Sequence, residues 1–203
     1  MNRISYKTIR NSATAELKVK GSKFIVHARH VETPGQAEKV VEDISKQYHD
    51  ATHNCYAYRT GYPADLITRQ SDDGEPSGTA GRPILTVISG RRLFNVVVVV
   101  TRYFGGTRLG TGGLVRAYTD SANLALQEAK IIVKYLSQRL QFNFPYVLTG
   151  QVDKLVNKYN AQIQHVDYSV SVDETILIRK DHADAFIEEL THISGGKIKV
   201  NTL

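Results

Sequence analysis

Five consecutive valines at 96–100 constrain the fold of this chain more than any other feature. Valine is branched at Cβ and favours extended backbone, so a valine run of this length predicts a buried strand. The strand is expected to stop at Arg102, and five of the chain's fifteen glycines follow between 105 and 113. A helical pattern then begins at Leu114. We therefore predict a buried strand, a glycine-rich loop and a helix start in immediate succession.

A second unusual segment, residues 71–83, precedes this strand. Its sequence is Ser-Asp-Asp-Gly-Glu-Pro-Ser-Gly-Thr-Ala-Gly-Arg-Pro, with three carboxylates and three glycines in thirteen residues. Almost nothing in it is apolar, so it has little to bury. A long loop of this kind is more than a compact domain needs as a connection. We therefore expect function to be found in these two segments.

Five blocks of the sequence resemble the signature of the Impact/YigZ family: residues 72–81, 101–106, 109–118, 20–24 and 51–58. The blocks are long and ordered, and the resemblance covers nearly the whole chain. It implies an N-terminal domain similar to a ribosomal-protein and elongation-factor-G domain IV fold, followed by a ferredoxin-like domain. It also implies a role in translation, because eukaryotic members of the family regulate translation through a protein partner.

Composition limits the class of protein. The chain has 203 residues, of which 41% are hydrophobic and 23% charged, as in ordinary globular proteins. The five-valine run is far too short to span a membrane, and Cys55 is the single cysteine, so we expect a cytoplasmic protein. Through residue 134 there are 19 Lys and Arg against 12 Asp and Glu, a net +7, whereas the remainder has net −1. A basic N-terminal part suggests an anionic partner.

Periodicity and turn residues predict an α+β chain of two domains, residues 1–134 and 135–203. In the first domain we expect the order β-β-β-α-β-α-β-α, with residues 60–79 as a long polar loop. Its predicted strands are 6–9, 13–19, 23–31, 52–59 and 94–101. Its predicted helices are about 34–48, which starts with Pro34 after the N-cap Thr33, and about 83–89 and 114–125. The second domain shows the ferredoxin-like order β-α-β-β-α-β. Its predicted strands are 136–144, 162–170, 174–179 and 197–200, with helices after Pro145 and at 183–193.

The glycine-rich segment is the candidate ligand site. A strand, a glycine loop and a helix start together form an anion site, because the first-turn N–H groups lack partners and the helix dipole is positive there. No lysine follows the loop as nucleotide-hydrolysing enzymes require, and the dinucleotide-binding glycine pattern also fails. We expect no cofactor and no catalytic residue. The candidate nucleic-acid-binding residues are Arg102, Tyr103, Phe104, Gly105, Gly106, Arg108, Gly110, Thr111, Gly112, Gly113 and Arg116.

The acidic segment allows two interpretations. Its polar candidates are Asp72, Asp73, Glu75, Ser77, Thr79 and Arg82. With His53, the three acids could bind a divalent metal or act as general acid and base. In the favoured interpretation they form a tight turn, and their carboxylates cap backbone amides or pair with Arg82 and Arg102. We therefore assign no metal.

His53 and Cys55 are two residues apart on a predicted strand, so they face the same side. A Cys–His pair can act as nucleophile and base when the thiol contacts the imidazole. A thiol among bulky tyrosines more often packs as a small hydrophobe, and we favour that interpretation.

Three functional hypotheses follow. The first is a translation-associated protein whose basic N-terminal domain binds RNA or the ribosome. The second is an adaptor that binds a translation-factor protein, and the third is a metal-dependent hydrolase built on the acidic segment. The oligomeric state stays open. For the first hypothesis, residues 71–83 and 101–113 should meet on one concave surface, with Arg102 and Arg82 neutralising the acids.

Overall fold

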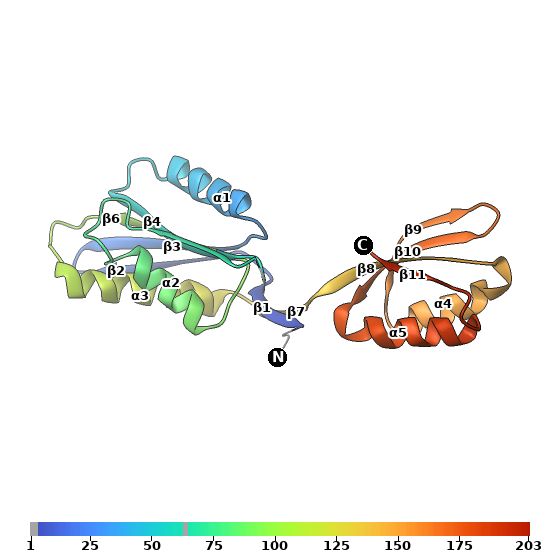
Figure 1. The fold of residues 1–203 in the computed structure, drawn as a ribbon. Coiled ribbons are helices and arrows are strands. Elements are labelled where there is room, and N and C mark those ends of the chain that lie inside the picture. Colours follow the sequence, from blue (N-terminus) through green and yellow to red (C-terminus); the bar gives the residue numbers. More distant parts are fainter. Residues whose placement is uncertain (1–3, 63–64) are drawn as a thin grey trace. The chain divides into compact units, whose positions relative to one another are not determined.

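The computed structural model describes residues 4–62 and 65–203 (Figure 1). Residues 1–3 of the predicted first domain and 63–64 of the predicted polar loop lie outside this range. The chain divides into two compact units between Lys134 and Tyr135, and Ile4 and Ser5 group with the second unit. Both units combine helices with sheets, so the predicted α+β fold of two domains is confirmed.

A five-stranded antiparallel sheet forms the centre of the N-terminal domain, in the order β2-β3-β6-β4-β5. Its strands are β2 (Ala13–Val19), β3 (Ser22–His30), β6 (Val96–Tyr103), β4 (His53–Thr60) and β5 (Ile67–Ser71). The valine run is the middle strand, and all five valines are fully buried. Because side chains alternate along a strand, Val96, Val98 and Val100 enter one core while Val97 and Val99 enter another.

Helices cover both faces of this sheet (Figure 1). α1 (Pro34–Gln47) packs on one face, and α2 (Gly81–Gly90) and α3 (Gly110–Glu128) pack on the other. The Thr33 side chain caps α1 by accepting a hydrogen bond from the amide of Gln36. This two-layer cover explains why β6 is apolar at consecutive positions, as in a strand buried on both faces.

Two strands of this domain differ from the prediction. β5 lies inside the segment predicted as a polar loop, and β7 (Ile131–Tyr135) follows α3 and pairs with β1 (Ser5–Ile9) in a separate two-stranded sheet. β5 is an edge strand, and four of its five side chains are exposed, so it carries no alternating apolar pattern. Hydrophobic periodicity therefore could not reveal it.

The C-terminal domain has a four-stranded sheet in the order β11-β8-β10-β9, with every pair antiparallel. This is the ferredoxin-like topology that the sequence predicted. Its elements are β8 (Ser137–Phe144), the 3-10 turn η1 (Tyr146–Leu148), α4 (Thr149–Lys158), β9 (Gln162–Tyr168), β10 (Val172–Arg179), α5 (Lys180–Ile193) and β11 (Val200–Thr202). The last strand begins three residues later than predicted. A separate core, which includes Phe142 and Phe186, joins the sheet to the two helices.

Within the described residues, no helix has the length and apolar character needed to cross a membrane.

Candidate functional site

A cavity of about 450 Å³ lies where β6 ends and α3 begins. Both unusual segments of the sequence contribute to its wall. The lining residues are Thr52, His53, Glu75, Pro76, Arg102, Phe104, Arg108, Leu109, Gly110, Thr111 and Leu114. We call this cavity the α3 pocket. Its volume falls within the usual range of small-ligand sites.

Strand geometry positions the Arg102 side chain at this pocket. Arg102 follows Val98 and Val100 on the same face of β6, and it lies opposite His53 on β4 and Phe24 on β3. The guanidinium carbon is 5.6 Å from the centre of the Phe24 ring. The side chain is therefore held against the sheet by its neighbours on both sides, with only 5% of the residue exposed.

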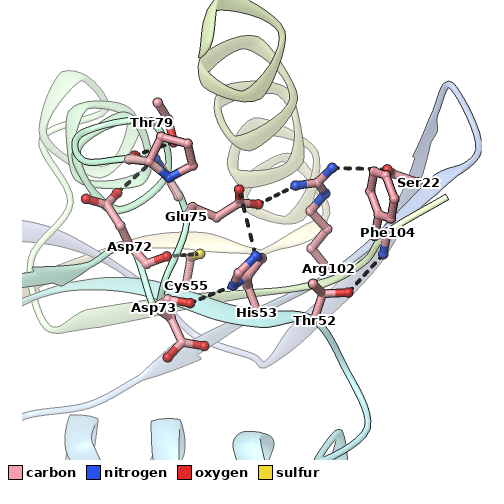
Figure 2. Close-up of polar contacts among 12 residues, drawn as sticks. Ser22, Thr52, His53, Cys55, Asp72, Asp73, Glu75, Thr79, Arg102 and Phe104 are labelled. Carbon is pink, nitrogen blue, oxygen red and sulfur yellow. Dashed lines mark hydrogen bonds and ion pairs between the residues drawn. The ribbon is translucent and has the colours of Figure 1, made fainter. Parts of the chain in front are cut away.

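Glu75 is the buried partner of this arginine (Figure 2). Arg102 Nη1 donates to Glu75 Oε1 at 2.6 Å, and the Tyr118 hydroxyl on α3 donates to the same oxygen at 2.8 Å. Arg102 Nη2 also donates to Ser22 Oγ at 3.3 Å, at the start of β3. One carboxylate thus joins the acidic segment, the central strand and α3 in a single buried network.

The other two acids of the segment bind backbone amides. Asp72 Oδ1 accepts hydrogen bonds from Ala80 and Gly81 at the start of α2, and Oδ2 accepts one from Gly78. Burial acts to raise the pKa of Asp72, but these three amides outweigh it and hold the pKa below its ordinary value. Asp73 Oδ2 accepts the amide of Asn54 at 2.6 Å.

This geometry matches the tight-turn interpretation of the acidic segment. The three carboxylates have separate partners, and no group of three His, Cys, Asp or Glu side chains in the described part of the chain is placed to bind a metal ion. Among the described residues, the metal-dependent hydrolase hypothesis therefore lacks a group of side chains that could bind the metal ion. Of the two expected arginine partners, Arg102 pairs with Glu75, whereas Arg82 is exposed and does not line the pocket.

His53 faces the pocket with a fixed ring orientation. Its Nδ1 is 2.6 Å from the carbonyl oxygen of Asp73, which can only accept, so Nδ1 carries a proton. Its Nε2 lies 3.9 Å from Glu75 Oε2. His53 therefore offers Nε2 to a molecule in the pocket.

Cys55 lies below this layer, in the core. Its sulfur is 3.0 Å from the carbonyl oxygen of Asp72 and 3.3 Å from the Tyr118 hydroxyl. Burial above all raises the pKa of the thiol far above its ordinary value, so the reactive thiolate does not form near neutral pH. The interpretation as a packed small residue, favoured from the sequence, agrees with this position, and a nucleophilic role does not.

The glycine loop combines close packing with an open helix start. A Cβ on Gly105 would lie 1.8 Å from the carbonyl carbon of Gly21, so this position is limited to glycine by the adjacent hairpin turn. Gly106 and Gly110 have φ of +84° and +71°, which other residues rarely adopt. At the start of α3 no side chain caps the helix, and its first turn has no acidic residue. The first amides of α3 thus lack a side-chain acceptor.

The other candidate binding residues divide between the pocket and its surroundings. Phe104 lines the pocket with 47% of the residue exposed, but Tyr103 points to the other face of β6 and donates to Asp50. Arg108 and Thr111 are exposed and line the pocket. Besides Tyr103, the candidates outside the lining are Gly105, Gly106, Gly112, Gly113, Arg116, Asp72, Asp73, Ser77, Thr79 and Arg82. The Thr79 hydroxyl donates to the carbonyl of Pro76 within its own turn.

Several residues of the site were not identified as site residues from the sequence. Thr52, Pro76, Leu109 and Leu114 line the pocket, and Ser22 and Tyr118 belong to the buried network beneath it. Thr52, Leu109, Leu114 and Tyr118 lie in family-like blocks, but their residue types carry no signal of binding chemistry by themselves. The contact of Ser22 with Arg102 spans 80 positions, so no local pattern contains it.

Comparison with known proteins agrees with the sequence blocks. The model of the Impact N-terminal domain matches residues 20–126, and that of a domain of unknown function matches residues 142–197. The chain is 36% identical to the IMPACT family member YvyE of Bacillus subtilis (strain 168), over 95% of this chain and 88% of the relative. It is 34% identical to the IMPACT family member YigZ of Escherichia coli (strain K12), over 90% of each.

A solved crystal structure, titled only as that of a hypothetical protein, has the same two-domain fold. The two superpose with a TM-score of 0.74 at 30% sequence identity. The match covers 98% of this chain and 97% of the chain in that crystal structure. The matches extend over both domains. The chain therefore belongs to the IMPACT family.

Proposed function

We propose that this chain is a cytoplasmic, translation-associated regulatory protein whose N-terminal domain binds RNA, free or in the ribosome, through the α3 pocket. The supporting observation is the uncapped start of α3, which faces a pocket that also carries Arg108. Backbone amides at a helix start and an adjacent arginine are a common arrangement for binding phosphate. The net charge of +7 through residue 134 favours a polyanionic partner.

The acidic segment is the main objection to an RNA site, because clustered carboxylates repel phosphate. Glu75 is paired with Arg102, and Asp72 is surrounded by three backbone amides. The Glu75 charge is thereby paired within the protein, and the Asp72 and Asp73 carboxylates, which do not line the pocket, are engaged by backbone amides. An incoming phosphate can then interact with Arg108 and the first turn of α3.

Salt-dependent RNA binding tests this proposal. Phosphate contacts release counterions, so we expect affinity for single-stranded RNA to fall by roughly tenfold or more between low and physiological ionic strength. Arg108→Ala should weaken binding. It should also reduce the slope of log affinity against log salt by about one, as expected when one phosphate contact is lost. Fluorescence anisotropy of a labelled RNA, titrated at several salt concentrations, measures both quantities.

Arg10→Ala is the matched control, because Arg10 is an exposed arginine of the same domain that does not line the pocket. It should change the slope less than Arg108→Ala does. If no RNA binds with salt-sensitive affinity, or both variants behave alike, the pocket is not an RNA site. A stoichiometric protein partner recovered from nuclease-treated lysate in that case would favour the adaptor hypothesis.

A further inference from the structure

The α3 pocket offers hydrogen-bond acceptors as well as anion-binding donors. Glu75 Oε1 accepts from both Arg102 and Tyr118, but Oε2 accepts no hydrogen bond from the described residues. The Glu75 side chain is only 3% exposed, and it lines the pocket. A carboxylate oxygen normally accepts at least one hydrogen bond, so Glu75 Oε2 is available to a donor group that enters the pocket.

His53 adds a second acceptor beside the first. Its Nδ1 proton is donated to the Asp73 carbonyl, so in the neutral form of the imidazole it is Nε2 that has a free lone pair, 3.9 Å from Glu75 Oε2. Two neighbouring acceptors favour a ligand with hydroxyl or amino donors. The start of α3 and Arg108, in the same pocket, favour an anion. A phosphate close to hydroxyl donors, as in a nucleotide, fits both.

Phe104 supplies the third recognition element. It lines the same pocket, and 47% of the residue is exposed. The guanidinium carbon of Arg102 is 5.6 Å from the ring centre, which holds the ring beside the buried network. An exposed aromatic ring in a basic pocket is a stacking surface for a nucleic-acid base, with little dependence on which base it is.

We propose that the α3 pocket holds one ribonucleotide of an RNA strand and distinguishes RNA from DNA. Its phosphate lies at the start of α3, its ribose 2′-hydroxyl donates to Glu75 Oε2, and its base stacks on Phe104. Carboxylates bind ribose hydroxyls in this way in other nucleotide sites, and the 2′-hydroxyl is the group that DNA lacks. A volume of about 450 Å³ is appropriate for a ligand of this size. The proposal rests on the proposed function.

A ligand series with the unmodified protein gives the first test. Single strands of one sequence are prepared as RNA, as DNA and as the 2′-fluoro form, which cannot donate a hydrogen bond at that position. We expect RNA to bind about tenfold more tightly than DNA, as for one hydrogen bond to a charged group, and the 2′-fluoro strand to resemble DNA. Equal binding of RNA and DNA, still dependent on Arg108, overturns the ribose inference alone. Absence of binding by either polymer overturns the proposed function as well.

Glu75→Gln tests the acceptor itself. Glutamine can keep one oxygen for Arg102 and Tyr118, and it replaces the other with an NH₂ group that donates instead of accepting. The RNA-to-DNA affinity ratio should fall to about one, and this ratio cancels the change that the lost carboxylate charge makes to both affinities. An unchanged ratio in a folded variant contradicts the proposal. If thermal melting shows that this variant is unfolded, the ligand series decides the question.

Phe104→Ala is the matched variant, because it removes a base contact and leaves the ribose contact intact. It should weaken RNA and DNA by a similar factor of about tenfold and preserve their ratio. A loss restricted to RNA would place the ribose, not the base, against this ring and would overturn the arrangement proposed.

Discussion

Glu174 on β10 is a carboxyl group in the core of the C-terminal domain. It lies between Phe142 and Val166 on the neighbouring strands, only 2% of the residue is exposed, and its Oε1 has no hydrogen-bond partner among the described residues. Burial, and secondarily the charge of Asp153, raises its pKa to about 7 from an ordinary 4.5. A raised carboxyl pKa means that the fold prefers the protonated form. The stability that protonated Glu174 contributes to the fold is fully present below pH 4.5 and is lost as pH rises through about 7.

We therefore predict that Glu174→Gln, compared with the wild type, stabilises the C-terminal domain more at about pH 8 than at about pH 5. Glutamine has a similar shape and never ionises, so the variant avoids the cost of a buried charge at high pH. The difference in unfolding free energy between variant and wild type should increase by on the order of 1–3 kcal/mol across this pH interval. Urea unfolding at both pH values measures it. The exposed Glu188→Gln serves as control, and a similar increase there would refute the assignment.

Arg102 is predicted to contribute strongly to the stability of the N-terminal domain. Arg102→Ala leaves Glu75 buried without its positive partner, so the free energy of unfolding should fall by about 3–5 kcal/mol. The exposed Arg108→Ala should change it by less than about 0.5 kcal/mol. Denaturant titration compares the two. Replacing both partners, Arg102→Met with Glu75→Met, should recover part of the loss, and no recovery would argue against a charge-pair origin.

At the residue scale, contacts within and between the two unusual segments could be predicted from sequence, whereas contacts with other parts of the chain could not. The capping of amides by Asp72 follows from its place in an Asp-Asp-Gly turn. The pairing of Glu75 with Arg102 was among the expected outcomes because opposite charges in a basic domain find each other. That Arg102 is buried, rather than free to contact RNA, depends on Ser22 and Phe24, which lie some 80 positions away.

At the scale of elements, two glycines near the start of α3 should respond oppositely to the same substitution. Gly105→Ala places a Cβ 1.8 Å from the backbone of Gly21, so the β2–β3 turn must move and melting temperature should fall by several degrees. Gly112 lies inside α3, and the position that a Cβ would occupy there has nothing within 4 Å. Gly112→Ala should therefore raise stability by roughly 0.5–1 kcal/mol, since alanine favours helix.

Thermal melting of both variants checks this pair. A loss of stability in Gly112→Ala would mean that the start of α3 is more constrained than its open surroundings indicate. RNA titration of the same variant adds a second measurement. If an RNA phosphate approaches the α3 amides, the new methyl group should weaken binding even though the fold is more stable.

Elements with a buried face could be predicted from sequence, and those without one could not. β6 was evident from its valines, and α1 from its proline start and apolar spacing. β5 has no buried side chain, and β7 alternates only between exposed and partly exposed residues. Their strand character depends on pairing with β4 and β1. Such pairing is a tertiary property that no window of sequence contains.

At the scale of the whole molecule, the order of elements predicted the ferredoxin-like domain, because few topologies satisfy β-α-β-β-α-β. The N-terminal domain was less accessible from periodicity, and the family resemblance contributed more to its assignment. That residues 71–83 and 101–113 meet at one pocket could be predicted from the sequence. The buried residues beneath the pocket could not. Cross-strand register places His53 opposite Arg102, and register follows from the assembled sheet.

Each hydrophobic core of the described residues draws its members from one domain only. Two clusters belong to residues 9–129, and a third belongs to residues 140–198 with partly buried neighbours up to Val200. Domains with their own cores unfold as separate cooperative units. We therefore predict two unfolding transitions in the full chain, observed by differential scanning calorimetry.

Domain-specific variants identify the two transitions. Arg102→Ala should lower only the transition of the N-terminal domain, because its partner Glu75 lies in that domain. Glu174→Gln at about pH 8 should raise only the transition of the C-terminal domain, where its core lies. RNA that binds the α3 pocket should raise the first transition and leave the second unchanged, since a ligand stabilises the unit that binds it. A single transition that shifts with both variants would show instead that the two domains unfold together.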